Sequence, residues 1–404
     1  MKVTALAGDV PAALAGALAA RGVDRRSAEA LAAGGAPVAL LLEPLDEADA
    51  TALVRGAARA GLDCHTGDGW AVVAGTLARL GGLARADASS PATERLSLAL
   101  GRFLQDVQDP PLVWRTARRA ISLERSSVVG ILNVTPDSFS DGGRHFALAD
   151  ALAGARAMRE AGAAVLDVGG ESTRPGAARP DEAEELRRVV PVVRALAAEV
   201  GLPVSVDTRR AAVARAALEA GAEIVNDVSG LTADPAMAEL VRGTGAGVVI
   251  MHMRGEPQTM DAAAVYRDVA AEVAAELAER RDAALAAGVE RERIVLDPGL
   301  GFAKTPAHNL RLLDCLGALV ALGHPVMVGP SRKRFLGAVT GRPVESRDAA
   351  TAAACVAARL RGARLFRVHD VAAAREALAV ADAVLAGGDD PAGRGAGTGG
   401  GARG

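Results

Sequence analysis

Eight short apolar runs, separated by helical patterns, constrain the fold of this chain more than any other feature. Polar residues or glycine bound each run, and the runs cover residues 128–134, 164–168, 203–207, 224–228, 248–253, 294–297, 325–329 and 364–368. Runs of this length are typical of strands buried on both faces. Strands that alternate with helices pair in parallel through right-handed crossovers, and a count of eight favours closure into a (β/α)8 TIM barrel. An open doubly wound sheet is the alternative, although no glycine-rich dinucleotide fingerprint follows the first run.

The segment before these runs predicts a separate unit. Residues 1–35 are rich in alanine and favour a helix over a secretion signal, because Asp9 and Pro11 interrupt the apolar stretch. A strand over 38–42, a helix over 46–60, a strand over 68–74 and a helix over 77–84 then predict a small β-α-β-α unit. A further helix over 93–107 ends before Pro110 and Pro111, which break the chain. We therefore place an N-terminal α/β appendage of unknown role at 1–110 and the barrel domain at 111–385.

Two further segments lie at the edges of the barrel domain. Residues 114–123 alternate loosely and predict a hairpin that closes the bottom of the barrel. Residues 386–404 contain nine glycines in 19 positions and have nothing to bury, so we expect a disordered tail.

Composition excludes several classes of function. The net charge is -3 and no basic cluster is present, so a nucleic-acid partner is not expected. No run of about 20 apolar residues could span a membrane. The three cysteines, Cys64, Cys315 and Cys355, are widely spaced and fit no metal pattern, which favours a reducing, cytoplasmic location.

Polar side chains stand at the end of every one of the eight runs. They include Asn133, Asp167, Asp207, Asn226, His252, Asp297, Lys333, Arg367 and His369. A single Asp after a strand is often only a helix cap. In a parallel barrel, however, all eight carboxyl ends open at one mouth, so polar residues at every end predict a functional site there.

The motifs at these ends carry a resemblance to a known family. In chain order they read NVTPDSFSDGG, DVGGESTRPGA, SVDT, IVNDVSG, MHMRG, LDPGLGFAK, GPSRK and FRVHD. Over about residues 112–385 the chain resembles the dihydropteroate synthase family of pterin-binding barrels, whose members join a dihydropterin to 4-aminobenzoate during folate synthesis. Leu300 departs from the family pattern, which often has an aromatic residue there, and Pro330 before Ser331 is a second departure. The first 110 residues lie outside the resemblance.

The resemblance implies a role for particular residues of this sequence. The pterin pocket falls on Asp207, Asn226, Met251, Asp297, Lys333 and Arg367. The diphosphate site falls on Asn133, Thr173, Arg174, Arg367 and His369, with Mg²⁺ on Asn133. The 4-aminobenzoate site falls on Phe139, Thr173, Pro175, Phe302, Ser331 and Lys333. Catalysis is assigned to Asn133, Asp141, Arg174, Asp207, Lys333, Arg367 and His369.

This assignment agrees with the chemistry of the side chains. A pterin edge presents paired N–H donors that match a carboxylate, and acceptors that match an ammonium. One amide oxygen is a plausible protein ligand for Mg²⁺, which usually keeps several waters. No side chain resembles a covalent nucleophile beside a base, so we expect the C–O bond to break first and the pterin ring to spread the positive charge.

The loops after the first two strands are expected to act as lids. Residues 137–143 and 172–177 are polar and glycine-flanked, and too poor in apolar residues to pack when empty. The resemblance pairs Asp141 with Arg174 on closure. We therefore expect 4-aminobenzoate to bind only after diphosphate is held. A homodimer is also implied.

Two other functions compete with this hypothesis. A methyltetrahydrofolate-dependent methyltransferase would share the pterin-reading residues but has no use for a diphosphate site. A non-catalytic pterin-binding protein should have lost charged residues at the mouth, and none is missing. For the remaining polar residues we expect packing, capping or surface roles: His252, Lys304, Arg332, Asp227, Asp370 and the Cys64-His65 pair. Asp167 and Glu171 are expected to be structural anchors of the loop after the second strand.

Overall fold

The computed structural model describes residues 2–6, 38–75, 77–85, 90–108, 111–134, 144–171, 180–256, 259–260 and 262–386. Within these ranges, side chains are described except at 2–6, 38–39, 77–78, 102–108 and 144–147. The tail expected to be disordered lies outside the described residues from position 387 onward.

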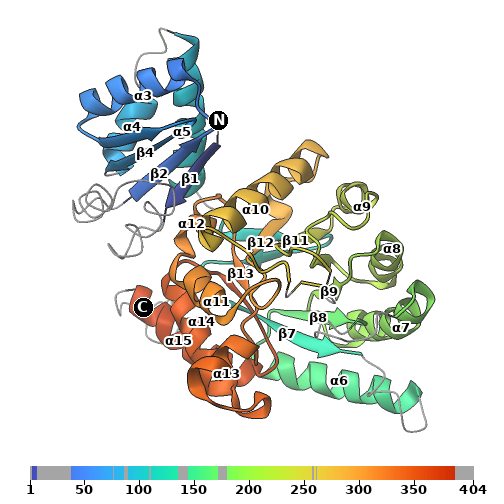
Figure 1. Ribbon diagram of the computed structural model, residues 1–404. Helices are drawn as coiled ribbons and strands as arrows, with labels where there is room; N and C mark the ends of the chain where they lie inside the picture. The colour runs from blue at the N-terminus through green and yellow to red at the C-terminus, as the bar shows by residue number, and fades with distance from the viewer. Residues whose placement is uncertain are drawn as a thin grey trace, which may run out of the picture.

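Eight parallel strands form the barrel that the apolar runs predict (Figure 1). They are β7 (Ser127–Asn133), β8 (Val165–Gly169), β9 (Val204–Asp207), β10 (Ile224–Asp227), β11 (Gly247–Met251), β12 (Ile294–Asp297), β13 (Met327–Val328) and β14 (Leu365–Val368). The strands pair in the order β12-β11-β10-β9-β8-β7-β14-β13. A parallel bridge between Leu296 and Val326 joins the two ends, and the N–H of Leu296 donates to the Pro325 carbonyl at 2.9 Å. The closed barrel is thus confirmed, and the open sheet is excluded.

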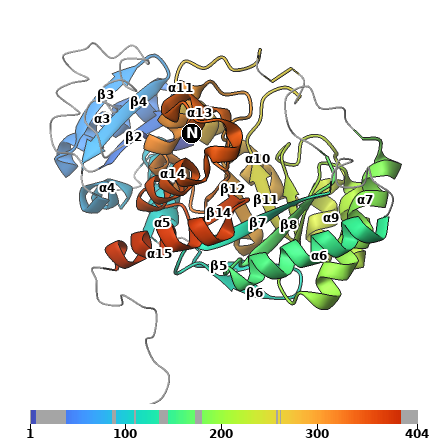
Figure 2. The same ribbon diagram turned by 90° about the horizontal axis from the view of Figure 1, so that it is seen from below.

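Helices cover the outside of the barrel (Figures 1 and 2). They are α6 (Arg144–Glu160), α7 (Glu182–Glu199), α8 (Ala211–Ala220), α9 (Met237–Thr244), α10 (Val269–Ala286), α11 (Pro306–Asp314), α12 (Gly317–Val320), α13 (Arg334–Thr340), α14 (Asp348–Leu360) and α15 (Val371–Leu385), with 3-10 turns at η2 (Arg291–Arg293) and η3 (Val344–Ser346). Asp268 caps α10 by accepting from the N–H groups of Ala270 and Ala271. Asp370 caps α15 through Ala373 N, as expected. None of the described helices is long and apolar enough to cross a bilayer.

A hairpin closes the bottom of the barrel, as predicted. Strands β5 (Val113–Arg115) and β6 (Ala120–Ser122) pair in antiparallel. Trp114 is 1% exposed and its Nε1 donates to the Arg293 carbonyl at 2.9 Å. Its ring and Leu123 pack against inward-facing residues such as Val129 and Val249. Because this end is filled by apolar packing, the functional site belongs at the opposite, carboxyl ends of the strands.

The N-terminal unit is a four-stranded sheet with helices, and it differs from the β-α-β-α expectation. Its elements are β1 (Lys2–Leu6), β2 (Val38–Glu43), α3 (Glu47–Ala60), β3 (Asp63–Gly67), β4 (Trp70–Gly75), α4 (Leu77–Ala84) and α5 (Pro91–Gln108). The sheet is antiparallel, in the order β1-β2-β4-β3. The helix expected over 1–35 is wrong at 2–6, where β1 pairs with β2; residues 7–37 lie outside the described part. Strand β3 was missed because its polar sequence, DCHTG, lacks the alternation of a half-buried strand.

The N-terminal sheet and the barrel are in contact. Strand β1 runs beside α10 and α12 of the barrel. Ala321, which follows α12, belongs to the apolar cluster formed by Leu40, Leu53 and Leu80 of the N-terminal unit. The chain passes from α5 to β5 within a few residues of Pro111. The domain boundary at 110 stays a prediction, because a boundary is a statement about independent folding.

Candidate active site

The carboxyl ends of the barrel strands bring charged side chains from distant parts of the chain to one mouth. Asn133, Asp207, Asp227 and Asp297 are the last residues of β7, β9, β10 and β12, and Arg367 lies near the end of β14. Parallel register fixes this convergence: Asn133 is paired with Gly169, and Gly169 with Asp207. The site is therefore a property of the barrel, not of any single loop.

Arg367 lies between two carboxylates. Its Nε is 2.6 Å from Asp167 Oδ2, and its Nη2 is 2.8 Å from Asp207 Oδ2. The Nδ2 of Asn226 donates to the same Asp167 oxygen at 3.1 Å. Asp167 is 1% exposed, and within the described residues its other oxygen, Oδ1, has no hydrogen-bond partner. A buried carboxylate oxygen without a donor indicates a place where a ligand N–H belongs.

Sequence reasoning missed the place of Asp167 in this site. It was expected to be a structural anchor of the second loop, whereas it bonds two predicted pterin-site residues, Asn226 and Arg367. Its position at the end of the second apolar run was an available signal. The other expected anchor, Glu171, bonds the buried Arg209, which also pairs with Glu256.

Burial sets the charge of these groups. Desolvation raises the pKa of Asp207 to about 7, although the charge of Arg367 opposes the shift. Burial likewise raises the pKa of Asp297, against the opposing charge of Lys333. Desolvation lowers the pKa of Lys333 to about 8. The site thus holds groups poised to change charge near neutral pH, which is common where chemistry occurs.

Lys333 reaches across the mouth to the loop that follows β12. Its Nζ donates to the Leu300 carbonyl and lies 4.7 Å from the centroid of the Phe302 ring. Gly301 has a φ of +80°, and a Cβ there would stand 2.9 Å from the Cδ of Lys333. Glycine is thus required both by the backbone and by the passage of the lysine stem. Phe302 is 8% exposed and shares an apolar cluster with Met251.

Ser331 and His369 form a hydrogen-bonded pair at the mouth. The backbone N–H of His369 donates to Ser331 Oγ at 3.2 Å, and Oγ lies 2.9 Å from His369 Nδ1. When Oγ donates its proton to Nδ1, a neutral ring carries its own proton on Nε2 and can donate it to an anion.

Asn133 offers the one predicted metal ligand. A Cβ on Gly169 would lie 3.6 Å from Asn133 Oδ1 and 3.7 Å from Asp207 Oδ2. The missing side chain therefore leaves room between an amide oxygen and a carboxylate oxygen, the donor types that Mg²⁺ prefers. The described residues contain no cluster of three or more His, Cys, Asp or Glu that would hold a metal by itself. A Mg²⁺ that keeps most of its waters fits this donor set.

Five predicted site residues lie outside the described part of the chain. They are Phe139, Asp141, Thr173, Arg174 and Pro175. Two other residues have the modest roles expected of them: Asp227 accepts from Ser229 and Leu231 in a turn, and Arg332 forms a two-point ion pair with Asp348.

A closed parallel barrel with buried carboxylates and cations at its mouth is typical of a barrel enzyme that binds a polar substrate at the carboxyl ends of its strands. The family model described as pterin binding enzyme matches residues 129–369. Dihydropteroate synthase of Mycobacterium leprae is 53% identical over 272 residues, covering 66% of this chain and 95% of the relative. The Escherichia coli enzyme is 44% identical, covering 66% and 94%. The chain belongs to the dihydropteroate synthase family of pterin-binding enzymes.

Solved structures agree with this assignment. Xanthomonas albilineans dihydropteroate synthase with 4-aminobenzoic acid has a TM-score of 0.64 and 48% identity, covering 68% of this chain and 98% of that one. The same enzyme in complex with 7,8-dihydropteroate has a TM-score of 0.62 and 47% identity, covering 68% and 99%. The matched share corresponds in size to the barrel alone.

Proposed function

We propose that this chain is a transferase of folate biosynthesis. It moves the (7,8-dihydropterin-6-yl)methyl group from diphosphate to the amine of 4-aminobenzoate, which gives 7,8-dihydropteroate and diphosphate. The observation that carries the proposal is the arrangement of Arg367 between Asp167 and Asp207, beside Asn226. Relatives named for this activity share 42–53% identity with the chain, which supports the same substrates.

The pterin is recognised by carboxylates and an amide at the mouth. Asp297 accepts from the 2-amino group and N3–H of the ring, and Asn226 and the unpaired oxygen of Asp167 face the same edge. Lys333 donates to the acceptor edge of the ring. Met251 supplies an apolar surface beneath it. A pocket of buried polar groups rejects analogues that lack the matching donors, because each unmatched group loses its hydrogen bond.

The reaction begins with departure of diphosphate. Arg367 and the Nε2 proton of His369 bind the leaving group, and their charge stabilises the negative charge that develops on it. When bound through Asn133, Mg²⁺ would supply further neutralisation of this charge. Ionised Asp207 stabilises the positive charge that the pterin ring acquires, which explains why a carboxylate is buried beside Arg367.

The amine of 4-aminobenzoate then attacks the pterin methylene. The aniline is neutral at physiological pH, so the site needs no strong base. Phe302 supplies an apolar wall, and Ser331 and Lys333 offer donors for the carboxylate of the substrate. The loop residues Phe139, Thr173, Arg174 and Pro175 are assigned to the same half of the site by the family resemblance.

Pyrophosphate release measured with and without 4-aminobenzoate tests the proposed function. The purified chain, supplied with the pterin diphosphate and Mg²⁺, should release pyrophosphate in step with formation of dihydropteroate. A methyltransferase would instead transfer a methyl group from methyltetrahydrofolate and release no pyrophosphate. A chain that binds pterin but releases no pyrophosphate under any condition would be a non-catalytic binding protein.

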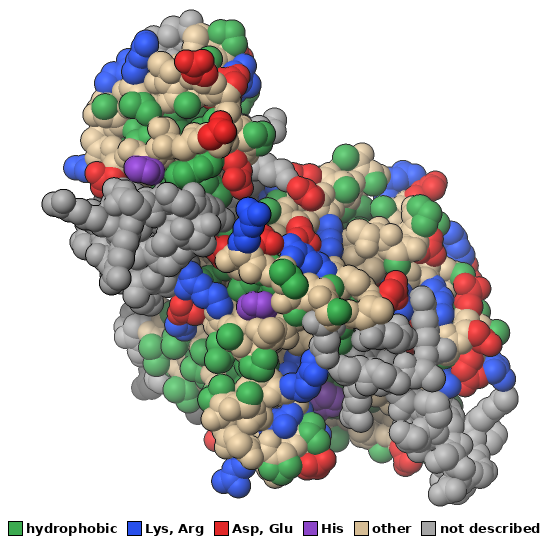
Figure 3. Space-filling view, viewed as in Figure 1, with side chains coloured by type: hydrophobic (Ala, Val, Ile, Leu, Met, Phe, Trp, Pro, Cys, Tyr) green, Lys and Arg blue, Asp and Glu red, His purple; other side chains and the backbone are tan. Residues whose placement is uncertain are grey.

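We also propose a homodimer in the cytoplasm. Exposed apolar side chains gather on α14 and α15, namely Leu360, Val380, Val384 and Leu385 (Figure 3). Burial of such a patch against a second copy would remove it from water. Sedimentation of wild type and of a Val380→Glu, Val384→Glu variant tests this: the variant should sediment as a monomer. The three free thiols are consistent with a reducing compartment.

A further inference from the structure

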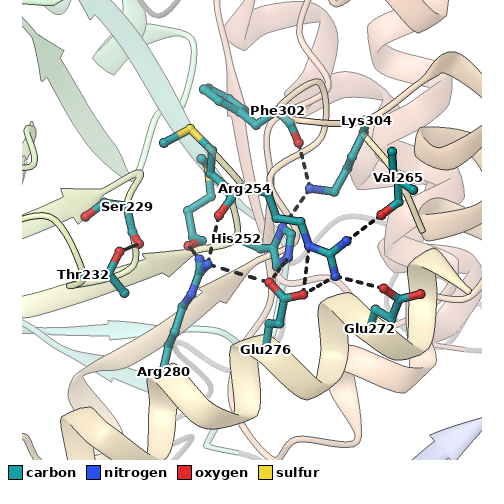
Figure 4. Close-up of polar contacts among 12 residues, drawn as sticks. Ser229, Thr232, His252, Arg254, Val265, Glu272, Glu276, Arg280, Phe302 and Lys304 are labelled. Carbon is teal, nitrogen blue, oxygen red and sulfur yellow. Dashed lines mark hydrogen bonds and ion pairs between the residues drawn. The ribbon is translucent and has the colours of Figure 1, made fainter. Parts of the chain in front are cut away.

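A polar cluster around the buried His252 and Lys304 lies where the ends of β11 and β12 meet α10 (Figure 4). We call it the His252 cluster, and it contains His252, Arg254, Glu276, Arg280 and Lys304. The imidazole of His252 has no exposed surface. Its Nε2 lies 3.0 Å from Glu276 Oε2, and its Nδ1 lies 3.0 Å from Lys304 Nζ. The proposed mechanism uses none of these groups, so it does not explain why His252 and Lys304 are buried.

Lys304 is the least expected member of the cluster. It is 3% exposed, and its Nζ also donates to the carbonyl of Phe302 at 2.9 Å. Within the described ranges, no carboxylate forms an ion pair with it. Burial lowers the pKa of this amine well below its usual value. Burial also lowers the pKa of His252 to about 4, so the ring is neutral.

The donors and acceptors of the cluster match if Lys304 is a neutral amine. Such an amine has two N–H groups, and two acceptors receive them: the Phe302 carbonyl and the Nδ1 lone pair of His252. The proton of His252 then sits on Nε2 and is donated to Glu276. Glu276 also accepts from Arg254 at 2.9 Å. Among the described residues these are the two acceptors bonded to Nζ, so an ammonium would bring a third N–H without an acceptor.

The use of lysine in this chain is selective. Of the 46 lysine and arginine side chains, only Lys2, Lys304 and Lys333 are lysines. Both lysines of the barrel hold the loop that joins β12 to α11. Arginine cannot lose its proton and needs more acceptors than this buried position supplies. The chain therefore keeps a compact amine at position 304 while using arginine almost everywhere else.

The two lysines hold two carbonyls of that loop, one on each side of Gly301 in the sequence. Lys333, in the mouth, donates to the Leu300 carbonyl, and Lys304 donates to the Phe302 carbonyl. The first part of the loop has its own anchor, because Gly299 N donates to Asp297 Oδ1 at 2.7 Å. The N–H of Phe302 donates to the Gly299 carbonyl at 3.0 Å, and Lys304 holds the carbonyl of the same residue, so loss of Lys304 should shift Phe302 more than Asp297.

We propose that Lys304 is a positioning residue for the 4-aminobenzoate half of the site. By holding the Phe302 carbonyl, with His252 and Glu276 holding its amine in turn, it fixes the Phe302 ring against which the acceptor substrate lies. This inference rests on the proposed function. It assigns to the His252 cluster a role in the binding of 4-aminobenzoate that is separate from pterin recognition.

Replacement of Lys304 by methionine in the full-length chain tests the proposal. Methionine has a similar length and cannot donate. The KM for 4-aminobenzoate should rise about tenfold, the effect of one lost buried hydrogen bond. The Kd for the pterin diphosphate, measured by calorimetry, should stay within about twofold, because Asp297 and Lys333 are unchanged. In a Phe302→Ala background, Lys304→Met should raise the KM no further. Lys304→Arg should raise the KM for 4-aminobenzoate as Lys304→Met does.

Thr116→Val is the matched control, because it removes a buried hydrogen bond to Glu223 at the bottom of the barrel. It should lower the unfolding midpoint and leave both constants unchanged. The proposal is overturned if Lys304→Met behaves like this control, or if KM and Kd change equally. If Lys304→Met does not fold, Lys304→Gln, which keeps a donor, takes its place. Its KM for 4-aminobenzoate should rise by a smaller factor, while its Kd for the pterin diphosphate should again stay the same. If the wild-type protein has no synthase activity, the proposed function itself is overturned. If the wild-type protein is active and Lys304→Met has an unchanged KM for 4-aminobenzoate, only the positioning role is overturned.

Discussion

Asp167→Asn removes one negative charge beside Arg367 without changing the volume of the side chain. The Asp167 Oδ2 accepts from Arg367 Nε at 2.6 Å and from Asn226 Nδ2 at 3.1 Å, and an amide oxygen can replace it in both bonds. The charge-assisted bond becomes a neutral one, at a cost of about 1–1.5 kcal/mol. The new NH₂ group takes the place of Oδ1, which has no partner within the described residues. An unmatched buried donor costs about 1–3 kcal/mol more.

The sum of about 2–4.5 kcal/mol corresponds to a roughly 30- to 2000-fold loss if it appears in the transition state. We therefore expect kcat/KM for the pterin diphosphate, measured by pyrophosphate release, to fall at least about 30-fold. Asp370→Asn is the control, because asparagine caps α15 as well as aspartate does. A kcat/KM for Asp167→Asn within about threefold of the control would refute the assignment of Asp167 to the pterin site.

Three further predictions follow from the charges, contacts and loops. Because Asp207, with a pKa of about 7, must be ionised and Lys333, with a pKa of about 8, must be protonated, kcat/KM should be bell-shaped with its maximum between these values. A flat profile across this range would contradict both roles. A chain that begins at Pro111 should keep its turnover, with a lower unfolding midpoint because Ala321 becomes exposed; a folded but inactive truncation would show that the appendage contributes to the site. Titration of 4-aminobenzoate should show weak binding to the free enzyme and strong binding with pyrophosphate and Mg²⁺, and equal affinities would exclude the ordered lid.

The barrel could be predicted because its strands are buried on both faces. Each apolar run corresponds to a strand with ends shifted by a few residues, as 224–228 does to β10. Boundaries set by single hydrogen bonds could not be predicted as well. Helix α10, for example, starts at Val269 because the side chain of Asp268 caps it. Strand β1 was missed because five residues within an alanine-rich stretch carry no periodicity of their own.

The site was predictable in its residues but not in their partners. Parallel strands bring their carboxyl ends together, so Asp207, Asn226, Asp297 and Arg367 could be placed at one mouth from their positions alone. The sequence does not say which carboxylates hold Arg367, and Asp167 was therefore expected to be only a structural anchor of its loop. The burial of Lys304 was equally hidden, since a lysine in a loop is usually exposed.

The central claim is that side chains at the barrel mouth form hydrogen bonds with the polar edge of a pterin. Calorimetric titration of the pterin diphosphate into the wild-type protein and into the Asp297→Ala variant tests this claim. The ring presents two N–H donors to Asp297, and their loss of an acceptor should weaken binding by about 2–6 kcal/mol. We expect affinity for the variant to fall by at least about 30-fold. Near-normal affinity in Asp297→Ala would contradict the account.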